Sequence, residues 1–590
     1  MKDSGENSVQ YQLNFVADSV YFAKVLFSKS TFMKNLFTSF AALLMAGMFF
    51  THYSAMGQEV LYSNHFNDPT GQLPPGWVLD GAQAPWSVAS SAMAGGEAPE
   101  LFLGFSFASG LSRLISPVIN IEGHQELCLR FKQYLFNYEM DYGEIIGVDV
   151  TYDGGATWEA LMEKPVGLLN IPQDEFSYYF TAPQGSGQLQ FAFRFEGYNY
   201  AINFWAIDDL FVESPVDHDL LTGYFSGNTT PEAGEEQLYF LEVINGGAIA
   251  QQDYTVNLFS GDGTLLSTAA GLPVAFGEKM YHLFWWTPST DNIGSMDIYA
   301  EIEFADDQHP DNNRTASLVI YVQPAGIEYV QIGSGSHPLN SLPCNFFNLH
   351  SYTQSLYLPE EVGVSGFPLT GLQYTCQFDV DLEEVTVQIL LGETAQTNLA
   401  DNWINPATLT PVFNGTIDFS KGFNNLYIPL DNPYTYNGGN LVVQTVKSFS
   451  EMVVGAVFIS SIDTGASRSR IAERDDMPFN PMTLPEFGYS VDYYPNITLF
   501  YSTGITSAEP ALDLPVVSAY PNPVSSRLFV QSGERMTEVR ITDLAGREIL
   551  RENAVSQEHT LNVENLTPGL YLLQVKTAAG TATRKVQVLR

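Results

Sequence analysis

Short runs of alternating apolar and polar residues recur along most of the chain. Residues 127–131 (LCLRF), 147–151 (GVDVT) and 189–195 (LQFAFRF) are examples, and Gly, Asp or Pro residues lie between such runs. Because successive side chains of a β-strand point to opposite faces of its sheet, a period of two predicts half-buried strands joined by turns. An aromatic content of 13%, with 48 Gly and 32 Pro, favours the same structure. We expect an all-β protein.

The pattern changes several times along the 590 residues, a length that suits several domains. Residues 58–215 predict a jelly roll, residues 216–323 an Ig-like sandwich, and residues 324–502 a further β-rich domain of unnamed type. Residues 503–515 have linker composition, since they are small and polar with two prolines. Residues 516–590 predict a small Ig-like module. The expected fold is therefore a series of β-sandwiches.

Residues 33–57 have the three parts of a secretory signal peptide. Lys34 supplies the positive charge, an apolar core (FAALLMAGMFF) follows, and small residues precede an expected cleavage between Gly57 and Gln58. The apolar core is too short for a stable membrane span, although an internal anchor helix is the alternative. Because a signal peptide begins at the start methionine, we expect translation to start at the methionine that opens this segment. Residues 1–32 are then a doubtful extension.

The chain is strongly acidic, with a formal net charge of −41 at pH 7. Residues 516–590 contain nine Lys and Arg against seven Asp and Glu, so the acidity lies in the rest of the chain. Such a field repels phosphate groups and anionic lipid surfaces, and we therefore expect no nucleic-acid partner. Cations are the natural small partners of this acidic body.

Several landmarks in residues 58–215 occur together in one known family. They are Phe66, the LPPGW turn at 73–77, LISPVI at 114–119 and the closing WAIDDLFV at 205–212. In this order they resemble the MAM-like "cleaved adhesin", or choice-of-anchor J, family. The resemblance implies a jelly roll with a role in adhesion.

Jelly rolls similar to this one often hold a structural Ca²⁺ where the first and last strands meet. Such an ion needs six to eight oxygen ligands from carboxylates and backbone carbonyls. Asp208 or Asp209, with Asn67 or Asp68, are the expected ligands. The alternative is that these carboxylates cap a turn or face water. No other cofactor is expected.

Residues 216–323 resemble a second family. The segments EVINGG at 242–247, YTVNLF at 254–259 and WTP at 286–288 are followed by the acidic segments DD at 306–307 and DNN at 311–313. The order and spacing of these segments resemble CARDB, a family of cell-adhesion-related bacterial domains. This resemblance also implies a surface location.

The last 75 residues contain four short motifs in a fixed order. Proline fixes φ where a strand begins and glycine permits a positive φ, so each motif bounds a strand with turn chemistry. The motif residues are Tyr520, Pro521, Asn522 and Pro523, then Asp543, Gly546 and Arg547, then Pro568, Gly569 and Tyr571, and finally Lys585. Together they resemble the type A C-terminal sorting domain of the type IX, or Por, secretion system of Bacteroidetes-type bacteria.

The sorting-domain resemblance implies a folded tag that the secretion machinery recognises for passage through the outer membrane. A sorting-domain protease would then remove the tag in the linker, and anionic lipopolysaccharide would be attached in its place. The product would be located at the cell surface or secreted. A small Ig-like domain without a sorting role is the alternative.

The sequence contains no recognised catalytic motif. Its nine histidines form no HxH or HExxH pattern, and no GxSxG motif is present. Cys128, Cys344 and Cys376 lack CxxC spacing, so neither a zinc site nor a disulfide-rich scaffold is expected. Cys344 and Cys376 either form one disulfide or remain two buried thiols.

Residues 151–158 (TYDGGATW) fit the Asp-box pattern that is found in sialidases and related β-proteins. We expect a hairpin turn here rather than a catalytic site. In such a turn Asp153 accepts hydrogen bonds within its own loop, Gly155 takes a positive φ and Trp158 packs beneath.

Three tryptophans are candidates for stacking on sugars, namely Trp205, Trp285 and Trp286. Trp286, however, lies in an alternating strand and matches a core position of the CARDB pattern, so core packing is favoured over sugar binding.

We therefore expect a non-enzymatic surface protein, adhesin-like or binding matrix or glycans, with an unknown glycan or protein ligand. One alternative is a secreted hydrolase, a peptidase or glycosidase, with an unrecognised site. The other is a structural surface spacer.

Overall fold

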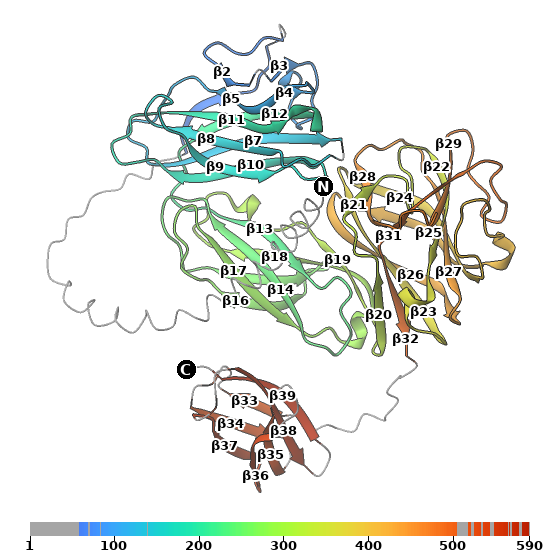
Figure 1. The fold of residues 1–590 in the computed structure, drawn as a ribbon. Helices are drawn as coiled ribbons and strands as arrows, with labels where there is room; N and C mark the ends of the chain where they lie inside the picture. The colour runs from blue at the N-terminus through green and yellow to red at the C-terminus, as the bar shows by residue number, and fades with distance from the viewer. Residues whose placement is uncertain are drawn as a thin grey trace. The chain divides into compact units, whose positions relative to one another are not determined.

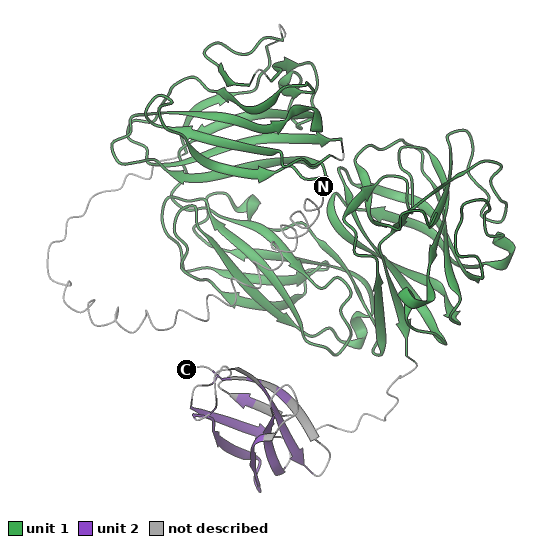
Figure 2. Ribbon diagram, viewed as in Figure 1, with its two compact units in different colours: residues 1–503 green, residues 504–590 purple. Residues whose placement is uncertain are grey.

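The computed structural model describes residues 58–503, apart from 69, 70, 83 and 139, and most of residues 517–588. In the second range the exceptions are 521–523, 525, 533, 534, 543–547, 565, 567, 568 and 578–580. The expected signal peptide and Gly57 lie outside the described residues, and Gln58 is the first described residue. The chain forms two compact units, residues 1–503 (unit 1) and residues 504–590 (unit 2) (Figure 2).

Nearly all regular structure in both units is antiparallel β-sheet, so the all-β prediction is confirmed (Figure 1). The described helices are single turns: η1 (Asn199–Ala201), η2 (Thr290–Asn292), η3 (Pro310–Asn312), α2 (Pro359–Val362) and η4 (Pro406–Thr408). Over the described ranges, no helix is long and apolar enough to cross a membrane.

The first domain of unit 1 is a sandwich of two sheets. Its strands are β1 (Val60–Asn64), β2 (Val78–Gly81), β3 (Trp86–Ala89), β4 (Glu100–Gly104), β5 (Ser109–Ile115), β6 (Ile119–Asn120), β7 (Glu126–Asn137), β8 (Ile145–Thr151), β9 (Glu159–Pro165), β10 (Ile171–Thr181), β11 (Gln188–Tyr198) and β12 (Ile202–Glu213). One sheet has the order β10-β7-β12-β4-β3 with β1 on β12, and the other has the order β2-β5-β11-β8-β9 with β6 on β11. Buried rings join the two sheets, as where Phe131 meets Phe193 edge to face at 5.2 Å.

The second domain is a smaller sandwich. Its strands are β13 (Leu220–Gly227), β14 (Gln237–Asn245), β15 (Thr255–Ser260), β16 (Leu265–Ala270), β17 (Lys279–Trp286), β18 (Gly294–Glu303) and β19 (Leu318–Val322). The sheets have the orders β13-β14-β17 and β16-β15-β18-β19. Along β17 burial alternates strictly, so that His282, Phe284 and Trp286 face the core. This is the period of two that the sequence predicts.

The third domain contains the largest sheet of unit 1, with seven strands. Its strands are β20 (Ile327–Ile332), β21 (His337–Leu339), β22 (His350–Tyr357), β23 (Phe367–Phe378), β24 (Leu382–Thr394), β25 (Thr410–Phe419), β26 (Gly422–Tyr436), β27 (Asn440–Ser448), β28 (Ala456–Ile462), β29 (Ser469–Arg474), β30 (Tyr489–Val491), β31 (Tyr493–Pro495) and β32 (Ile497–Ser502). A seven-stranded sheet, β20-β32-β23-β28-β21 with β26 and β31 attached, faces the six-stranded sheet β25-β24-β27-β22-β29-β30.

Cys344 and Cys376 lie in the core of the third domain, and Cys128 is buried in the first domain. All three are free thiols, so the expected alternative of buried thiols is the one observed, and no Cys344–Cys376 disulfide is present. Their side chains pack as small apolar groups among aromatic and aliphatic neighbours.

Hydrogen bonds join the first and third domains within unit 1. The Tyr134 hydroxyl donates to Asp379 Oδ2 at 2.7 Å, and Asn170 Nδ2 donates to the same oxygen at 2.8 Å. The second and third domains meet where the rings of Tyr321 and Tyr427 lie 4.7 Å apart.

Unit 2 is a small sandwich with its own core. Its strands are β33 (Val517–Tyr520), β34 (Arg527–Ser532), β35 (Met536–Thr542), β36 (Glu548–Glu552), β37 (Glu558–Asn562), β38 (Gly569–Thr577) and β39 (Thr581–Val588), in the sheets β33-β34-β37 and β36-β35-β38-β39. Leu528, Ile541, Leu573 and Val586 are fully buried between these sheets.

Part of the predicted sorting motif lies on these strands. Tyr520 ends β33, Gly569 begins β38, Tyr571 is buried in β38, and Lys585 lies in β39 opposite Leu572. The remaining motif residues lie outside the described part of the chain, namely Pro521, Asn522, Pro523, Asp543, Gly546, Arg547 and Pro568.

Candidate functional site

The residues predicted to bind calcium lie where the first and last strands of the first domain meet. β1 pairs with β12, with Asn64 opposite Leu210, so the residues that follow β1 approach Asp208 and Asp209. Asn67 and Asp68 are exposed, whereas Asp208 is fully buried. Asp209 has a positive φ of 46°, a conformation that is uncommon except for Gly, Asn, Asp and His.

Asp208 is the most unusual of these four residues. Its Oδ1 accepts a hydrogen bond from the Asp209 backbone N–H at 2.8 Å, but its buried Oδ2 has no hydrogen-bond partner among the described residues. Burial raises the pKa of this carboxyl to about 7, and the negative charges of Asp209 and Glu100 add to the effect. A buried carboxylate oxygen without a partner suits a bound cation or a proton.

Asp209 already has cationic partners. Its Oδ1 lies 2.7 Å from His65 Nδ1 and its Oδ2 lies 2.7 Å from Lys132 Nζ, which also donates to the Gly95 carbonyl at 3.3 Å. Burial opposes ionisation, but the hydrogen bonds from Lys132 and His65 outweigh it and lower the pKa of Asp209. The Lys132 ammonium therefore occupies the position next to Asp209 that a bound cation would take.

Glu100 is the second buried carboxylate of this region. It accepts hydrogen bonds from Ser91 Oγ at 2.5 Å, Met93 N at 2.8 Å and Ala94 N at 2.7 Å. These bonds fix the loop that covers Asp208, and Gly96 is needed there because a Cβ would lie 2.0 Å from Asp208 Oδ2.

Among described residues, no three His, Cys, Asp or Glu side chains form a group that could hold a metal. Of the expected ligands, Asp208 is the one whose buried carboxylate oxygen has no hydrogen-bond partner among the described residues.

The Asp-box segment forms the predicted turn. Asp153 Oδ1 accepts a hydrogen bond from Thr157 N at 2.9 Å, and Asp153 Oδ2 accepts one from Thr157 Oγ1 at 2.6 Å. These bonds lower the pKa of Asp153 to about 2. Gly155 has a φ of 91°, and the half-buried Trp158 ring lies under it. The residues of the box are thus used within their own loop.

The buried cysteines are poor nucleophiles. Burial raises the pKa of Cys128, Cys344 and Cys376 to about 12 each, so none is a thiolate near neutral pH. One serine–histidine contact, Ser448 Oγ to His350 Nδ1 at 2.8 Å, joins opposite residues of β27 and β22. Within the described part of the chain, no carboxylate is hydrogen-bonded to His350, so a charge-oriented triad is not assembled here.

Six aromatic side chains, which we call the aromatic tip, gather on loops at one end of the first domain. They come from the β4–β5 loop, the β7–β8 loop and the turn from β11 into η1. They are Phe105, Phe107, Tyr138, Tyr142, Tyr198 and Tyr200. Phe107 is 86% exposed and Tyr142 57% exposed. The rings form two groups: Phe105 contacts Phe107 and Tyr138, and Tyr142 contacts Tyr198 and Tyr200.

Buried polar groups hold these loops together. Glu144 is fully buried and accepts hydrogen bonds from Tyr142 N at 2.9 Å and Tyr198 N at 3.4 Å. Asn199 N donates to the Ala108 carbonyl at 3.0 Å, which ties η1 to the β4–β5 loop. The rings therefore project from a fixed backbone. These rings were not predicted as a site from the sequence, although they lie in the turn-rich segments GFSF (104–107), NYEMDYG (137–143) and GYNY (197–200).

Of the three tryptophans predicted as candidates, Trp205 and Trp286 are buried. Their favoured interpretation as core residues is therefore the observed one. Trp285 is 54% exposed on the opposite face of β17.

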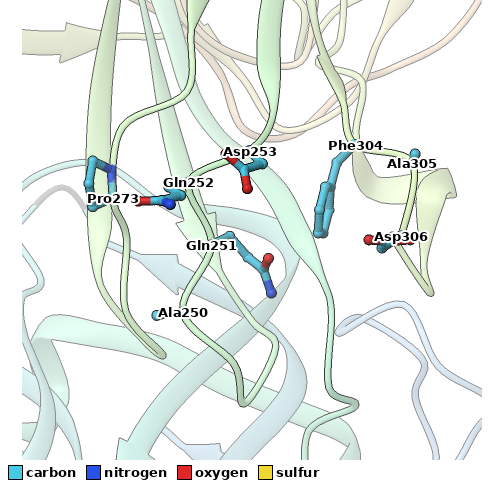
Figure 3. Close-up of a pocket in the computed structure, with 8 residues that line it drawn as sticks. All are labelled: Ala250, Gln251, Gln252, Asp253, Pro273, Phe304, Ala305 and Asp306. Atoms are coloured by element: carbon cyan, nitrogen blue, oxygen red, sulfur yellow. The ribbon is translucent and has the colours of Figure 1, made fainter. Parts of the chain in front are cut away.

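Two cavities of similar volume lie in unit 1. A cavity of about 310 Å³ adjoins the aromatic tip at Tyr138 and is also lined by Asn170, Phe347 and Gln377. A second, of about 290 Å³, lies in the second domain, where the Phe304 ring stands between Asp253 and Asp306 (Figure 3). Both of these carboxylates are exposed to water, which weakens their attraction for a cation.

Comparison with protein families matches residues 518–589 to the secretion system C-terminal sorting domain. The sorting domain predicted from the four motifs is confirmed. The protein is therefore exported by the type IX secretion system to the cell surface or the medium, and unit 2 is the part that interacts with the secretion machinery. A comparison with curated proteins gives no significant match.

Solved structures similar to parts of this chain belong to several kinds of protein. A CARDB domain from Pyrococcus furiosus, in complex with di-metal ions, is 22% identical, covers 18% of this chain and 90% of its own, and has a TM-score of 0.16. The K1 cleaved adhesin domain of Lys-gingipain from Porphyromonas gingivalis is 13% identical, covers 27% and 99%, and has a TM-score of 0.20. A β-glucuronidase from Bacteroides uniformis is 12% identical, covers 39% and 28%, and has a TM-score of 0.22. Both families that the sequence resembles thus occur among these structural neighbours.

Proposed function

We propose that this exported protein is a non-enzymatic, adhesin-like recognition protein that binds a glycan or a matrix protein through the aromatic tip. The tip is the observation that supports this function. Tyrosine and phenylalanine rings offer large contact areas at low entropic cost, and tyrosine hydroxyls add hydrogen bonds. Rings held by buried groups such as Glu144 lose little further freedom on binding.

A glycan and matrix-protein array tests this function. The chain from Gln58 to Arg590 should bind at least one ligand class, and Phe107→Ala or Tyr142→Ala should weaken that binding by about 10-fold or more, as expected for central aromatic contacts. Phe487→Ala and Tyr329→Ala are matched controls because these rings are 84% and 66% exposed elsewhere on unit 1. If all four variants bind as tightly as the wild type, the aromatic tip is not the binding site. If the wild-type chain binds no ligand on the array, a structural spacer is favoured instead.

The absence of catalysis is part of the same proposal. The purified chain should cleave neither a peptide panel nor a glycan panel. Turnover that disappears in Ser448→Ala or His350→Ala would overturn it, because those residues make the serine–histidine contact described above.

We further propose that Asp208 contributes to a structural Ca²⁺ site, as the jelly-roll resemblance implies. Its buried, unpartnered Oδ2 supports this assignment. Added Ca²⁺ should raise the melting temperature of the wild-type chain at pH 8, since a ligand that binds only the folded state stabilises it. Asp208→Asn should abolish that shift, whereas Asp141→Asn, on the exposed β7–β8 loop, should retain it. An equal shift in wild type and Asp208→Asn would disprove the assignment.

For the sorting step, we propose that a protease removes unit 2 within residues 503–515 and that anionic lipopolysaccharide replaces it. Mass spectrometry of the protein from the cell surface should find a C-terminus in this segment. A surface-bound product that retains Tyr571 and Lys585 would contradict this proposal.

A further inference from the structure

The sheet β13-β14-β17 of the second domain has two faces of different character. Its inner face contributes Tyr239, Leu241, Phe284 and Trp286 to the domain core. Its outer face also consists largely of big apolar side chains, although no described element covers it. These outer-face residues are Tyr224 (60% exposed), Leu238 (38%), Tyr281 (47%), Leu283 (51%), Trp285 (54%) and the half-buried Phe240.

The outer-face residues form one continuous patch. Leu238 lies opposite Trp285 and Phe240 lies opposite Leu283 on the neighbouring strand, and the ring of Tyr224 lies 5.8 Å from that of Phe240. Paired strands are about 4.8 Å apart and alternate residues of one strand about 7 Å apart. Adjacent members of the set are therefore within side-chain reach of each other.

The charge within this patch is already neutralised. Glu242, opposite Tyr281, accepts hydrogen bonds from Lys279 Nζ at 2.8 Å and from the Tyr281 hydroxyl at 2.7 Å. The outer face is thus a locally neutral, apolar surface on a molecule whose net charge is −41. A charged partner would therefore gain little electrostatic binding energy from the outer face.

The area of the outer face indicates what kind of partner can cover it. Three rings that expose about 100 Å² each, with two leucines, present roughly 500 Å² of apolar surface. This is near the upper end of what a monomeric protein exposes in one patch. Two such faces together bury about 1,000 Å², the lower limit of a specific protein–protein interface.

We propose that the outer face joins two copies of this chain in a weak, two-fold symmetric dimer. A second copy presents the same flat apolar face, so the contact is self-complementary and closes after two molecules. Face-to-face packing of two sheets at about 10 Å is a common arrangement. Leu238 and Leu283 at the centre neither stack on sugar rings nor form hydrogen bonds, so a protein face fits this chemistry better than a glycan does.

This dimer is independent of the ligand-binding role of the aromatic tip, and it would give that tip two copies per particle. Two linked sites raise the apparent affinity for a repetitive surface without any new contact. The dimer has a distinctive salt dependence, because two strongly acidic chains repel each other. Salt screens that repulsion, so association should become tighter as ionic strength rises.

Sedimentation velocity of the chain from Gln58 to Arg590 tests the proposal. We expect a monomer–dimer equilibrium with a Kd on the order of 10–100 µM, tightening as NaCl increases from about 0.02 M to about 0.5 M. Leu283→Glu and Trp285→Lys should each weaken it at least 10-fold. Leu265→Glu is the matched control, since Leu265 is 54% exposed on β16 of the same domain.

The melting temperature of each variant serves as a folding check, and all three should match wild type because the altered side chains are exposed. A chain that stays monomeric at every concentration and salt level would overturn the proposal. A dimer that both outer-face variants leave intact would also overturn it. Dimers that appear only after removal of residues 504–590 would assign the outer face to the chain's own unit 2 and would likewise refute it.

Discussion

At the scale of single residues, environment rather than residue type decides what the acidic side chains do. Asp208 and Asp209 are adjacent in sequence, yet burial raises the pKa of the first to about 7, while Lys132 and His65 lower that of the second. The sequence identified the pair through its position in the closing strand motif. It could not assign these opposite roles, because the Lys132 partner comes from β7 and the covering loop is held by Glu100.

The raised pKa of Asp208 predicts a pH dependence of stability in the absence of Ca²⁺. The folded state holds a proton up to about pH 7, whereas the unfolded carboxyl loses it near its ordinary value of 3.8. The free energy of unfolding should therefore fall as the pH rises from about 4 to 7 and level off above that range. Asp208→Asn resembles the protonated form, so it should be more stable than wild type at pH 8 by up to about 4 kcal/mol.

Urea titrations of both proteins at pH 4.5 and pH 8 in chelator measure this difference. The two curves should nearly coincide at the lower pH and separate at the higher one. A destabilised Asp208→Asn at pH 8 would show that the ionised carboxylate contributes to folding.

At the scale of elements, the period of two correctly predicts strands but not always their exposure. In β17 the outward residues Leu283 and Trp285 are exposed although they are apolar, and the inward His282 is buried. In β8, likewise, the polar Asp149 is 3% exposed, since it accepts hydrogen bonds from Arg113 Nε at 2.7 Å and Arg194 Nε at 3.0 Å. A polar residue in a strand therefore predicts exposure only when no opposite charge reaches it from a neighbouring strand, and such partners are separated by dozens of residues.

Arg468 gives an element-scale prediction in the third domain. Its buried guanidinium donates to the Leu356 carbonyl at 2.8 Å and to Glu361 of α2 at 2.5 Å, and it lies 4.3 Å from the Tyr494 ring. Arg468→Met removes these donors, so the Leu356 carbonyl loses its hydrogen bonds from the guanidinium and Glu361 keeps only the bond from the Leu358 backbone N–H at 2.7 Å. We expect a loss of about 3–5 kcal/mol in the free energy of unfolding, measured by urea denaturation.

The matched control for Arg468→Met is Arg474→Met, because the Arg474 side chain is 32% exposed. That change should cost about 1 kcal/mol or less. Equal losses of unfolding free energy in the two variants would mean that burial of the Arg468 guanidinium does not increase its contribution to the stability of the third domain.

At the scale of the whole molecule, the division between an acidic body and a near-neutral tag was readable from the sequence, because composition, linker and motifs all change near residue 503. The two candidate binding surfaces of the acidic body could not be predicted from the sequence in this way. The aromatic tip is assembled from three loops and the outer face from three strands, and strand pairing brings these segments together only in the fold. Export was therefore predicted in detail, whereas the candidate sites became visible only in three dimensions.

The separate cores of the two units predict independent unfolding. Unit 2 has its own buried cluster, including Ile541 and Leu573, and unit 1 has three others of comparable or larger size. Ile541→Asp buries a charge in unit 2, which is a severe penalty for so small a core. Calorimetry of the chain from Gln58 should then lose only the transition of unit 2, with the remaining transitions moving by about 1 °C or less. Cleavage within residues 503–515 should likewise leave those transitions in place. A shift of several degrees would instead mean that the sorting unit stabilises the body, and that its removal during export changes the stability of the mature protein.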